Sequence, residues 1–253
     1  LIPEFKDAPT FGKTLKQSHA WSKKAGLESV TGINRYIETG HEIDLINICE
    51  ARHYQQLSEL GEKIVEDSDT IRLICIAGPS SSGKTTFANR LRIELMSRGL
   101  RPIRLSIDDY YLPRGMAPLD EDGKPDLESI YALDIDLFNQ NMLDLINGEK
   151  VQLPKFDFHT GKRVPGRVLQ VAEDQPIIIE GIHALNEQLT TLIPKHQKFK
   201  IYIAPQAQIN LDDQNPISLT DLRLLRRLVR DKKFRNASAV ETMSMWPSVR
   251  KGE

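Results

Sequence analysis

A loop of small residues, "GPSSSGKT" at 78–85, joins an apolar segment to an amphipathic one and constrains the fold more than any other feature. It matches G-x-x-x-x-G-K-[ST] at every fixed position, and it has the context that this motif requires, a buried strand before it and a helix after it. Its glycines let successive backbone N–H groups point at one anion, and the N-terminus of the helix adds partial positive charge. The loop therefore predicts a site for a nucleoside triphosphate rather than a serine-rich linker.

The motif gives separate tasks to its residues. The Lys84 ammonium can reach the β- and γ-phosphates, and the Thr85 hydroxyl can ligate Mg²⁺. The predicted nucleotide-binding residues are Gly78, Pro79, Ser80, Ser81, Ser82, Gly83, Lys84, Thr85 and Thr86.

From residue 69 onward, short apolar runs alternate with helical periodicity. Continuous apolar runs of this length are typical of strands buried on both faces of a parallel sheet. The alternation predicts an α/β fold of the P-loop NTPase type, a doubly wound parallel sheet with helices on both faces. The expected strands cover 71–78, 101–109, 175–181 and 198–205, the expected helices 84–98, 134–148 and 218–234, and an expected protruding hairpin 150–171.

Residues 1–68 contain no strand-like alternation, and we expect a small helical segment there. Glycines stop two short expected helices, at 12–26 and 32–40, and a longer helix is expected over 42–66 with apolar residues at three- or four-residue steps. The acidic stretch 66–70 marks the expected boundary between a helical connector, 1–68, and the P-loop domain, 69–253. The chain has no initiator Met and no natural-looking end, so we expect a piece of a longer polypeptide with a truncated C-terminus.

Acidic residues follow two expected strands, at the edge where an open parallel sheet binds its ligands. Asp108 and Asp109 end the second strand, and Glu180 ends the run "IIIE". A carboxylate there can accept a proton from a hydroxyl group or hold Mg²⁺, and we expect one of the two aspartates only to cap the next segment. The expected metal-binding residues are Thr85, Asp108 and Glu180.

The last expected helix carries arginines on one face. At about 100° per residue, Arg223, Arg226, Arg227 and Arg230 cluster, and leucines with Val229 take the opposite half. Because the chain carries no excess positive charge, we interpret this face as a lid that closes over phosphates, with Arg235 just beyond it.

The overall composition argues against several classes of function. Lys and Arg total 34 and Asp and Glu total 35, so any anion site is local. No apolar stretch is long enough to span a bilayer, and the absence of a guanine-reading N-K-x-D motif argues against a GTPase. Cys49 and Cys75 lie in apolar runs, so we expect two reduced core thiols and a cytoplasmic protein.

Five segments occur in the order "GPSSSGKTT", "LSIDDYY", "LPKFDFHTGKR", "IIIEGIHAL" and "LRRLVRD". In this order they resemble the uridine kinase and phosphoribulokinase family of phosphate-loop kinases, over residues 70–250. They are most similar to bacterial nucleoside (uridine) kinases that follow a region resembling part of threonyl-tRNA synthetase. The resemblance implies transfer of the ATP γ-phosphate, with Mg²⁺, to a primary hydroxyl such as the 5′-OH of a nucleoside.

The resemblance also implies roles for single residues. Asp108 matches the family's catalytic base, and Glu180 matches the acid that joins the Mg²⁺ shell with Thr85. The remaining matches are Tyr111 near the sugar, Phe156 and Arg163 on the base-binding hairpin, Arg227 and Arg230 facing substrate and phosphate, and Arg235 in the lid.

Three positions depart from the uridine-cytidine kinases of this family. Gly161 stands where a His reads the pyrimidine, and Ala237 replaces the second arginine of the lid. Tyr131 stands where an acid holds the ribose hydroxyls, with Glu128 and Asp134 as candidate substitutes. The residues for phosphate transfer therefore match the family, while those that would recognise the acceptor differ.

Two alternatives to a nucleoside kinase stay open. The first keeps the chemistry and takes a sugar phosphate or a pantothenate-like alcohol, for which the hairpin offers Lys155, Lys162, Arg163 and Arg167. The second is a nucleotide-gated regulatory module that binds ATP without acceptor turnover. For a kinase the expected partner is a small-molecule acceptor, without a membrane or nucleic-acid partner, and a homo-oligomer is compatible with the sequence.

Overall fold

The computed structural model of the chain describes residues 9–121, 123, 125–157, 160–204, 209–212 and 215–251. It divides into unit 1, Leu1–Tyr54 with Pro205–Arg226, and unit 2, Gln55–Ala204 with Arg227–Glu253. Both divisions fall inside helices, α3 (Glu42–Glu66) and α6 (Leu219–Arg235). The boundary near residue 68 stays a prediction. In the described ranges, each helix is too short or too polar to cross a membrane.

A four-stranded parallel sheet forms the centre of unit 2. Its strands are β1 (Leu73–Ala77), β2 (Ile103–Ser106), β5 (Ile177–Glu180) and β6 (Lys198–Tyr202), in the order β2-β5-β1-β6. The register pairs Ile76 of β1 and Ser106 of β2 with Glu180 of β5, so these three strands end at the same edge. This edge holds the residues that follow the strands, which include the small-residue loop and Asp108. The predicted parallel α/β fold is confirmed.

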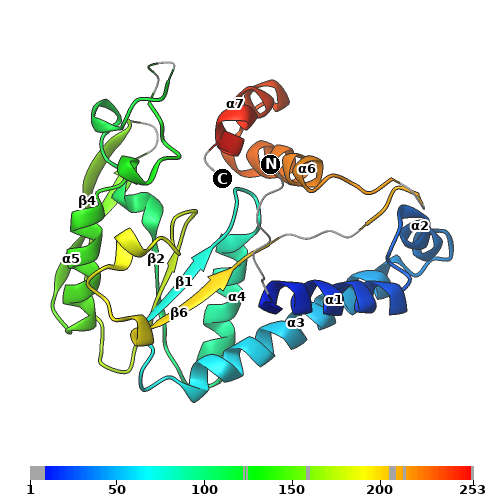
Figure 1. The fold of residues 1–253 in the computed structure, drawn as a ribbon, viewed down its shortest axis with the longest axis horizontal. Helices are drawn as coiled ribbons and strands as arrows, with labels where there is room; N and C mark the ends of the chain where they lie inside the picture. The colour runs from blue at the N-terminus through cyan, green and yellow to red at the C-terminus, as the bar shows by residue number, and fades with distance from the viewer. Residues whose placement is uncertain are drawn as a thin grey trace, which may run out of the picture. The chain divides into compact units, whose positions relative to one another are not determined.

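Helices cover both faces of the sheet because its central strands are apolar on both sides. Every residue of β1 is buried, and alternate residues belong to different cores. Leu73 and Cys75 pack with α5 (Ile135–Ile146) on one face. Ile74 and Ile76 pack with α4 (Lys84–Ser97) and with the end of α3 on the other. Figure 1 shows β1 and β6 between α5 and α4.

The second half of α3 is part of this core. Leu57 and Ile64 are 2% and 0% exposed and pack with α4. A Cβ added at Gly61 would lie only 2.8 Å from Cγ of Glu94 on α4, so the two helices approach closely at this glycine. The sheet domain therefore includes residues that precede its first strand.

Unit 1 contains α1 (Pro9–Lys24), α2 (Val30–Glu38), the first half of α3 and the segment that leads into α6. The backbone N–H of Val30 donates to the carbonyl of Asn210 (2.9 Å), and the N–H of Asn210 donates to the carbonyl of Glu28 (2.9 Å). The prediction of a core thiol at Cys49 is wrong: Cys75 is buried, but Cys49 is exposed. Its surroundings in the first half of α3 include Ile43 and Ile46, which are 66% and 59% exposed.

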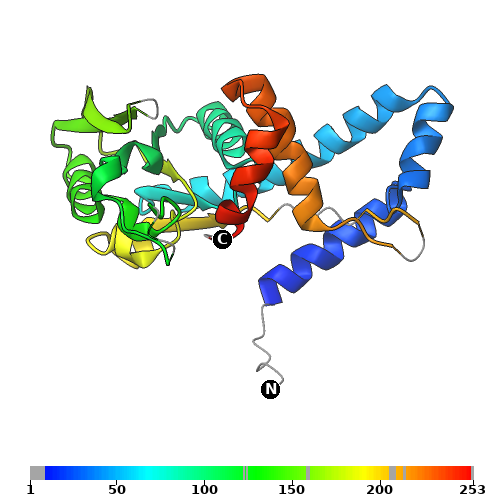
Figure 2. The ribbon, with the colours of Figure 1, turned by 90° about the horizontal axis from the view of Figure 1, so that it is seen from above.

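The remaining elements lie around the edge of the sheet. The predicted hairpin is confirmed as the antiparallel pair β3 (Val151–Asp157) and β4 (Lys162–Leu169). Helix α6 matches its prediction, whereas α7 (Ala239–Lys251), which contains Pro247, was not predicted. Figures 1 and 2 both show α7 beside the second half of α6. Short 3-10 turns are η1 (Ile107–Tyr110), η2 (Arg114–Met116), η3 (Ile130–Ala132), η4 (Glu187–Thr190) and η5 (Lys195–Gln197).

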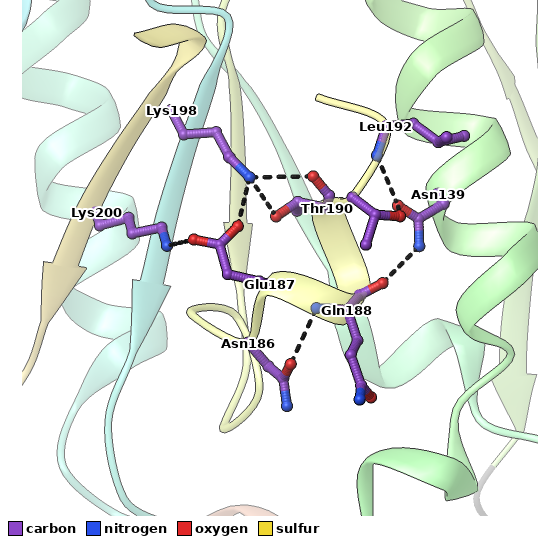
Figure 3. A network of polar contacts seen from close by, with 9 residues as sticks. Asn139, Asn186, Glu187, Gln188, Thr190, Leu192, Lys198 and Lys200 are labelled. Carbon is purple, nitrogen blue, oxygen red and sulfur yellow. Dashed lines mark hydrogen bonds and ion pairs between the residues drawn. The ribbon is translucent and has the colours of Figure 1, made fainter. Parts of the chain in front are cut away.

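A polar network fixes the segment after β5 against the edge strand β6 (Figure 3). The side chain of Lys198 is 2% exposed, and its Nζ donates to Glu187 Oε2 (2.7 Å) and to the carbonyl and hydroxyl of Thr190 (3.0 and 3.1 Å). Lys200 donates to the other oxygen of Glu187. A buried ammonium needs such partners, so the network holds η4 in place.

The same 3-10 turn is tied to α5 by a buried amide. Asn139 Nδ2 donates to the carbonyl of Gln188 (2.7 Å), and Asn139 Oδ1 accepts from the N–H of Leu192 (3.4 Å) (Figure 3). The chain that leaves Glu180 at the sheet edge is therefore anchored to a strand on one side and to a helix on the other.

Candidate active site

The loop between β1 and α4 has the backbone of an anion cradle. Gly83, the N-cap of α4, has φ +98°, a conformation that glycine adopts without steric cost. Ser81 also has a positive φ, of +62°. A Cβ at Gly78 would lie 2.5 Å from the carbonyl oxygen of Ile203, so the first glycine is required for packing. The loop thus has two left-handed residues directly before the N-terminus of α4, a backbone geometry that favours the binding of an anion.

Lys84 and Thr85 are the first two residues of α4 and directly follow Gly83 in the chain. Lys84 Nζ donates to the carbonyls of Gly78 (2.8 Å) and Pro79 (3.1 Å), so the ammonium lies against the loop. Thr85 Oγ1 donates to Glu180 Oε1 (3.1 Å), which joins the first turn of α4 to the end of β5. Thr86 is exposed on the same turn.

Asp108 lies in η1, where its backbone N–H donates to Ser106 Oγ (3.3 Å). Its side chain is accessible to solvent, but protein crowds the carboxylate on its other sides. Loss of hydration, followed by the negative charge of Glu180, raises the pKa of Asp108 to about 6, and the positive charge of Lys84 opposes this rise. The carboxylate can thus meet a small molecule and is more basic than an ordinary aspartate.

Asp109 has a different task from its neighbour. Its Oδ1 accepts from the backbone N–H of Phe156 (3.4 Å), so it fastens η1 to strand β3 of the hairpin. Burial raises the pKa of Asp109, while the Phe156 N–H and the charges of Lys155 and Arg167 lower it. Asp109 therefore positions the hairpin, whereas the pKa of Asp108 responds to the charges of Glu180 and Lys84.

Oxygen donors suited to Mg²⁺ meet at the sheet edge. Glu180 is 8% exposed, accepts from the Thr85 hydroxyl, and has Oε1 4.0 Å from Nη1 of Arg104. Mg²⁺ typically takes one or two carboxylates together with substrate phosphates and water. Thr85, Glu180 and the nearby Asp108 fit that requirement. Groups of three or more His, Cys, Asp or Glu that could hold a metal by themselves are absent from the described residues.

Two aromatic rings lie beside Asp108. The rings of Tyr111 and Phe156 are 5.6 Å apart, inclined at 57°. Burial raises the pKa of the Tyr111 hydroxyl, and the charges of Asp108 and Glu128 raise it further, so both carboxylates are near this tyrosine. The backbone carbonyl of Glu128 is 2.8 Å from Nε2 of His183. Phe156 is 7% exposed and Tyr111 is partly buried, so the tyrosine ring is the more accessible of the two.

Arg163 and Asp134 pair with each other rather than standing apart. Arg163 Nη1 donates to Asp134 Oδ2 (2.7 Å), and Asp134 Oδ1 accepts from the N–H of Leu137 as the N-cap of α5. Of the two acids considered as substitutes at position 131, Asp134 is therefore engaged in structure, whereas Glu128 lies near Tyr111. The side chain of Tyr131 is 61% exposed.

The arginines of α6 do not all belong to one unit. Arg223 and Arg226 belong to unit 1, and Arg227, Arg230 and Arg235 belong to unit 2 with the loop. Arg227 Nη1 donates to Ser80 Oγ (2.8 Å), and its guanidinium lies 6.0 Å from the ring centroid of Trp246 on α7.

The sequence prediction missed Asp231. This residue is fully buried among Arg227, Arg230 and Arg235. Its spacing of four residues from Arg227 and from Arg235 was the available signal, because side chains at that spacing meet on a helix.

Gly161 has a positive φ (+65°) in the hairpin turn. Residues 158 and 159, part of the motif "LPKFDFHTGKR", lie outside the described residues.

Comparisons with known proteins identify the family and the fold. The sequence pattern of the "Phosphoribulokinase / Uridine kinase family" matches residues 73–252. A uridine kinase of Staphylococcus aureus (strain JH9) is 32% identical over 179 residues, which cover 70% of this chain and 76% of that protein. A crystal structure from Silicibacter sp. TM1040, provisionally described as a fructose transport system kinase, has the same fold, with a TM-score of 0.56 and 19% identity over 78% of this chain and 93% of that one. The chain belongs to the phosphoribulokinase / uridine kinase family of kinases.

Proposed function

We propose that this protein transfers the γ-phosphate of ATP to a primary hydroxyl group, the 5′-OH of a nucleoside. One observation carries the proposal. The carboxylate of Asp108 is near enough to Lys84 and Glu180 for their charges to act on its pKa, at the sheet edge where the phosphate loop begins. A phosphoryl group held by the loop and a hydroxyl held at Asp108 would be neighbours.

The residues of the chain divide the work of such a transfer. The loop amides, the α4 N-terminus and Lys84 bind the phosphates and orient the terminal one. Asp108 accepts the proton of the attacking hydroxyl, and its pKa of about 6 makes it a stronger base than an ordinary aspartate while it stays ionised near neutral pH. Arg227 and Arg230 stabilise the negative charge of the transferring group, and Arg235 approaches the same region from the end of α6.

Mg²⁺ would be held by Thr85 and Glu180, with Asp108 at its edge. When bound, the ion neutralises phosphate charge and helps to orient the phosphates. The Thr85 hydroxyl donates to Glu180, which keeps both oxygen-bearing side chains together.

The charges around Asp108 favour an uncharged acceptor. Arg163 is paired with Asp134, and Arg167 Nη2 donates to the carbonyl of Arg104 (3.2 Å). The charges of Lys155 and Arg167 also act on Asp109. Arg163 is therefore engaged by a carboxylate of the protein, while the acids near Tyr111 would repel an acceptor that already carries phosphate. An uncharged nucleoside, with hydroxyls for Glu128 and a base for the partly buried Tyr111, suits these charges better than a sugar phosphate.

The acceptor is tested by measuring ADP release from Mg-ATP with nucleosides, sugar phosphates and pantothenate. We expect turnover that depends on a nucleoside and is lost with 5′-deoxynucleosides, which lack the attacking hydroxyl. Turnover only with a sugar phosphate or pantothenate would replace the nucleoside by that acceptor. ATP binding without turnover in any mixture would contradict a kinase and support a regulatory module.

We also propose that residues 1–68 connect the kinase to a threonyl-tRNA-synthetase-like region of a longer polypeptide. The support is the helical character of α1, α2 and α3, which precede the sheet. The sequence of the complete natural protein tests this directly, and a different region before residue 1 would contradict it.

A further inference from the structure

We propose that Asp231 is a positioning residue that holds Arg227, Arg230 and Arg235 as one set beside the phosphate loop. The inference rests on the proposed function, because it assumes that these arginines act on the phosphates of ATP. It concerns a residue that would touch neither ATP nor the acceptor.

The contacts of Asp231 define the set. Its side chain is 0% exposed. Its Oδ1 accepts from Arg230 Nε (2.9 Å) and lies 2.8 Å from Arg230 Nη2, and the same oxygen lies 3.8 Å from Arg235 Nε. Its Oδ2 lies 3.3 Å from Arg227 Nε. One carboxylate thus contacts three guanidinium groups from adjacent turns.

The burial pattern of α6 shows that this cluster, rather than apolar burial, orients its second half. Arg227 is 6% exposed, whereas Val229 and Phe234 are 67% and 73% exposed. An ordinary surface helix buries its apolar side chains and exposes its charged ones. Burying an ion pair seldom stabilises a fold more than apolar residues of similar size would. Arg227 is held inward at this cost, while the side chains of Arg230 and Arg235 are 31% and 60% exposed, so the cluster is better explained by what its cations contact.

One of the three arginines contacts the phosphate loop, and another acts on Asp108 through its charge alone. Arg227 Nη1 donates to Ser80 Oγ of the loop (2.8 Å), and the Arg235 charge acts on Asp108. Three guanidinium groups this close would repel one another and spread apart without a shared anion. Asp231 therefore fixes the spacing of the cations that face the loop and the base.

Asp231→Asn tests the proposal, with Asp221→Asn as the matched control. Asp221 lies in the first turn of the same helix and is exposed. For Asp231→Asn we expect kcat to fall roughly tenfold to a hundredfold, since small displacements of positioned groups have effects of this size. We expect ATP affinity to weaken several-fold, with the KM for the acceptor unchanged. For Asp221→Asn we expect kcat and ATP affinity to stay within about twofold of the unsubstituted protein, because Asp221 is exposed and its substitution leaves the cluster around Asp231 intact.

A second measurement separates positioning from mere stability. The chain has two tryptophans, so Trp246 is the single reporter in a Trp21→Phe background, and Arg227 lies over its ring. If Asp231 positions Arg227, Asp231→Asn changes the emission of Trp246 at temperatures where circular dichroism shows a fully folded protein. An unchanged kcat and ATP affinity would overturn the proposal. The proposal would also be overturned if the losses of kcat and ATP affinity disappeared at every temperature where the variant is fully folded and the emission of Trp246 stayed unchanged.

The two proposals fail separately. ATP affinity by calorimetry and Trp246 emission need no acceptor. If the unsubstituted protein turns over no acceptor, the proposed kinase function fails, while these two readouts still decide whether Asp231 holds the arginines at the loop.

Discussion

The phosphate loop and the arginine cluster contribute to the same site in opposite ways. The loop is a contiguous segment, 78–86, whose backbone supplies the binding groups and whose glycine at 83 carries the required positive φ. The cluster consists of side chains on two turns of α6 around the buried Asp231, with Trp246 of α7 beneath Arg227. A site formed by one contiguous backbone segment can be predicted from residue spacing. A cluster of helix side chains depends instead on what packs against the helix.

This difference predicts which substitutions act on binding and which act on chemistry. Asp108 belongs to neither region, and its pKa responds to the charges of Lys84 in the loop and of Arg235 in the cluster. Replacing it should therefore leave both regions intact and remove the proton acceptor, together with one carboxylate at the edge of the proposed Mg²⁺ site, which separates chemistry from ATP binding most sharply.

The largest effect is expected for Asp108→Asn. We expect kcat to fall by about 10³-fold, because loss of a general base typically has an effect of this order. ATP affinity should change little, since the loop and Lys84 remain. The coupled assay of ADP release and calorimetry with ATP measure the two quantities. Asp109→Asn is the control, and an equal loss of kcat there would remove the distinction between the two aspartates.

The next effect is expected for Lys84→Ala in the loop. Its Nζ is the charged group of the loop, so we expect kcat/KM for ATP to fall about 10²-fold with weaker ATP binding as well. The exposed Lys195 provides the control, as Lys195→Ala should be silent. Normal ATP binding by Lys84→Ala would mean that the phosphates are held elsewhere.

Arg227→Lys sharpens the comparison from the side of the cluster. The change keeps the charge but loses the planar group that contacts both Ser80 and Asp231. We expect roughly a tenfold loss of kcat with a smaller change in ATP affinity, because a lysine ammonium cannot place N–H donors on both partners as the planar guanidinium group does. Steady-state kinetics test this, and full activity would show that charge alone suffices at position 227.

The smallest effect is a pH dependence. Because the pKa of Asp108 is raised to about 6, its carboxylate gains a proton as pH falls through that value and can no longer accept one from the substrate. We expect kcat/KM for the acceptor to fall about tenfold per pH unit below pH ~6. The residual activity of Asp108→Asn should lack this acid limb. The same limb in that variant would assign the titration to another group.

Much of the fold could be predicted from the sequence because the central strands are short apolar runs buried on both faces. The loop could be predicted because its chemistry depends on spacing alone. The division of labour between Asp108 and Asp109 could not, since it depends on where the hairpin N–H of Phe156 lies.

Burial was the least predictable property. Ile43 and Cys49 lie on a helix with a regular apolar stripe, yet they are exposed because that half of α3 belongs to unit 1 rather than to the sheet core. On α6 the outcome is reversed, with Asp231 buried and Val229 exposed. Periodicity identifies the faces of a helix, but the partner decides which face is covered.

A crystal structure with a non-hydrolysable ATP analogue, Mg²⁺ and a nucleoside tests the central claim most directly. We predict that the triphosphate lies in the loop at 78–86 and that the 5′-oxygen lies within about 3.2 Å of an Asp108 oxygen, in line with the terminal phosphate. A terminal phosphate remote from Asp108, with no space between them for a hydroxyl group, would contradict the account.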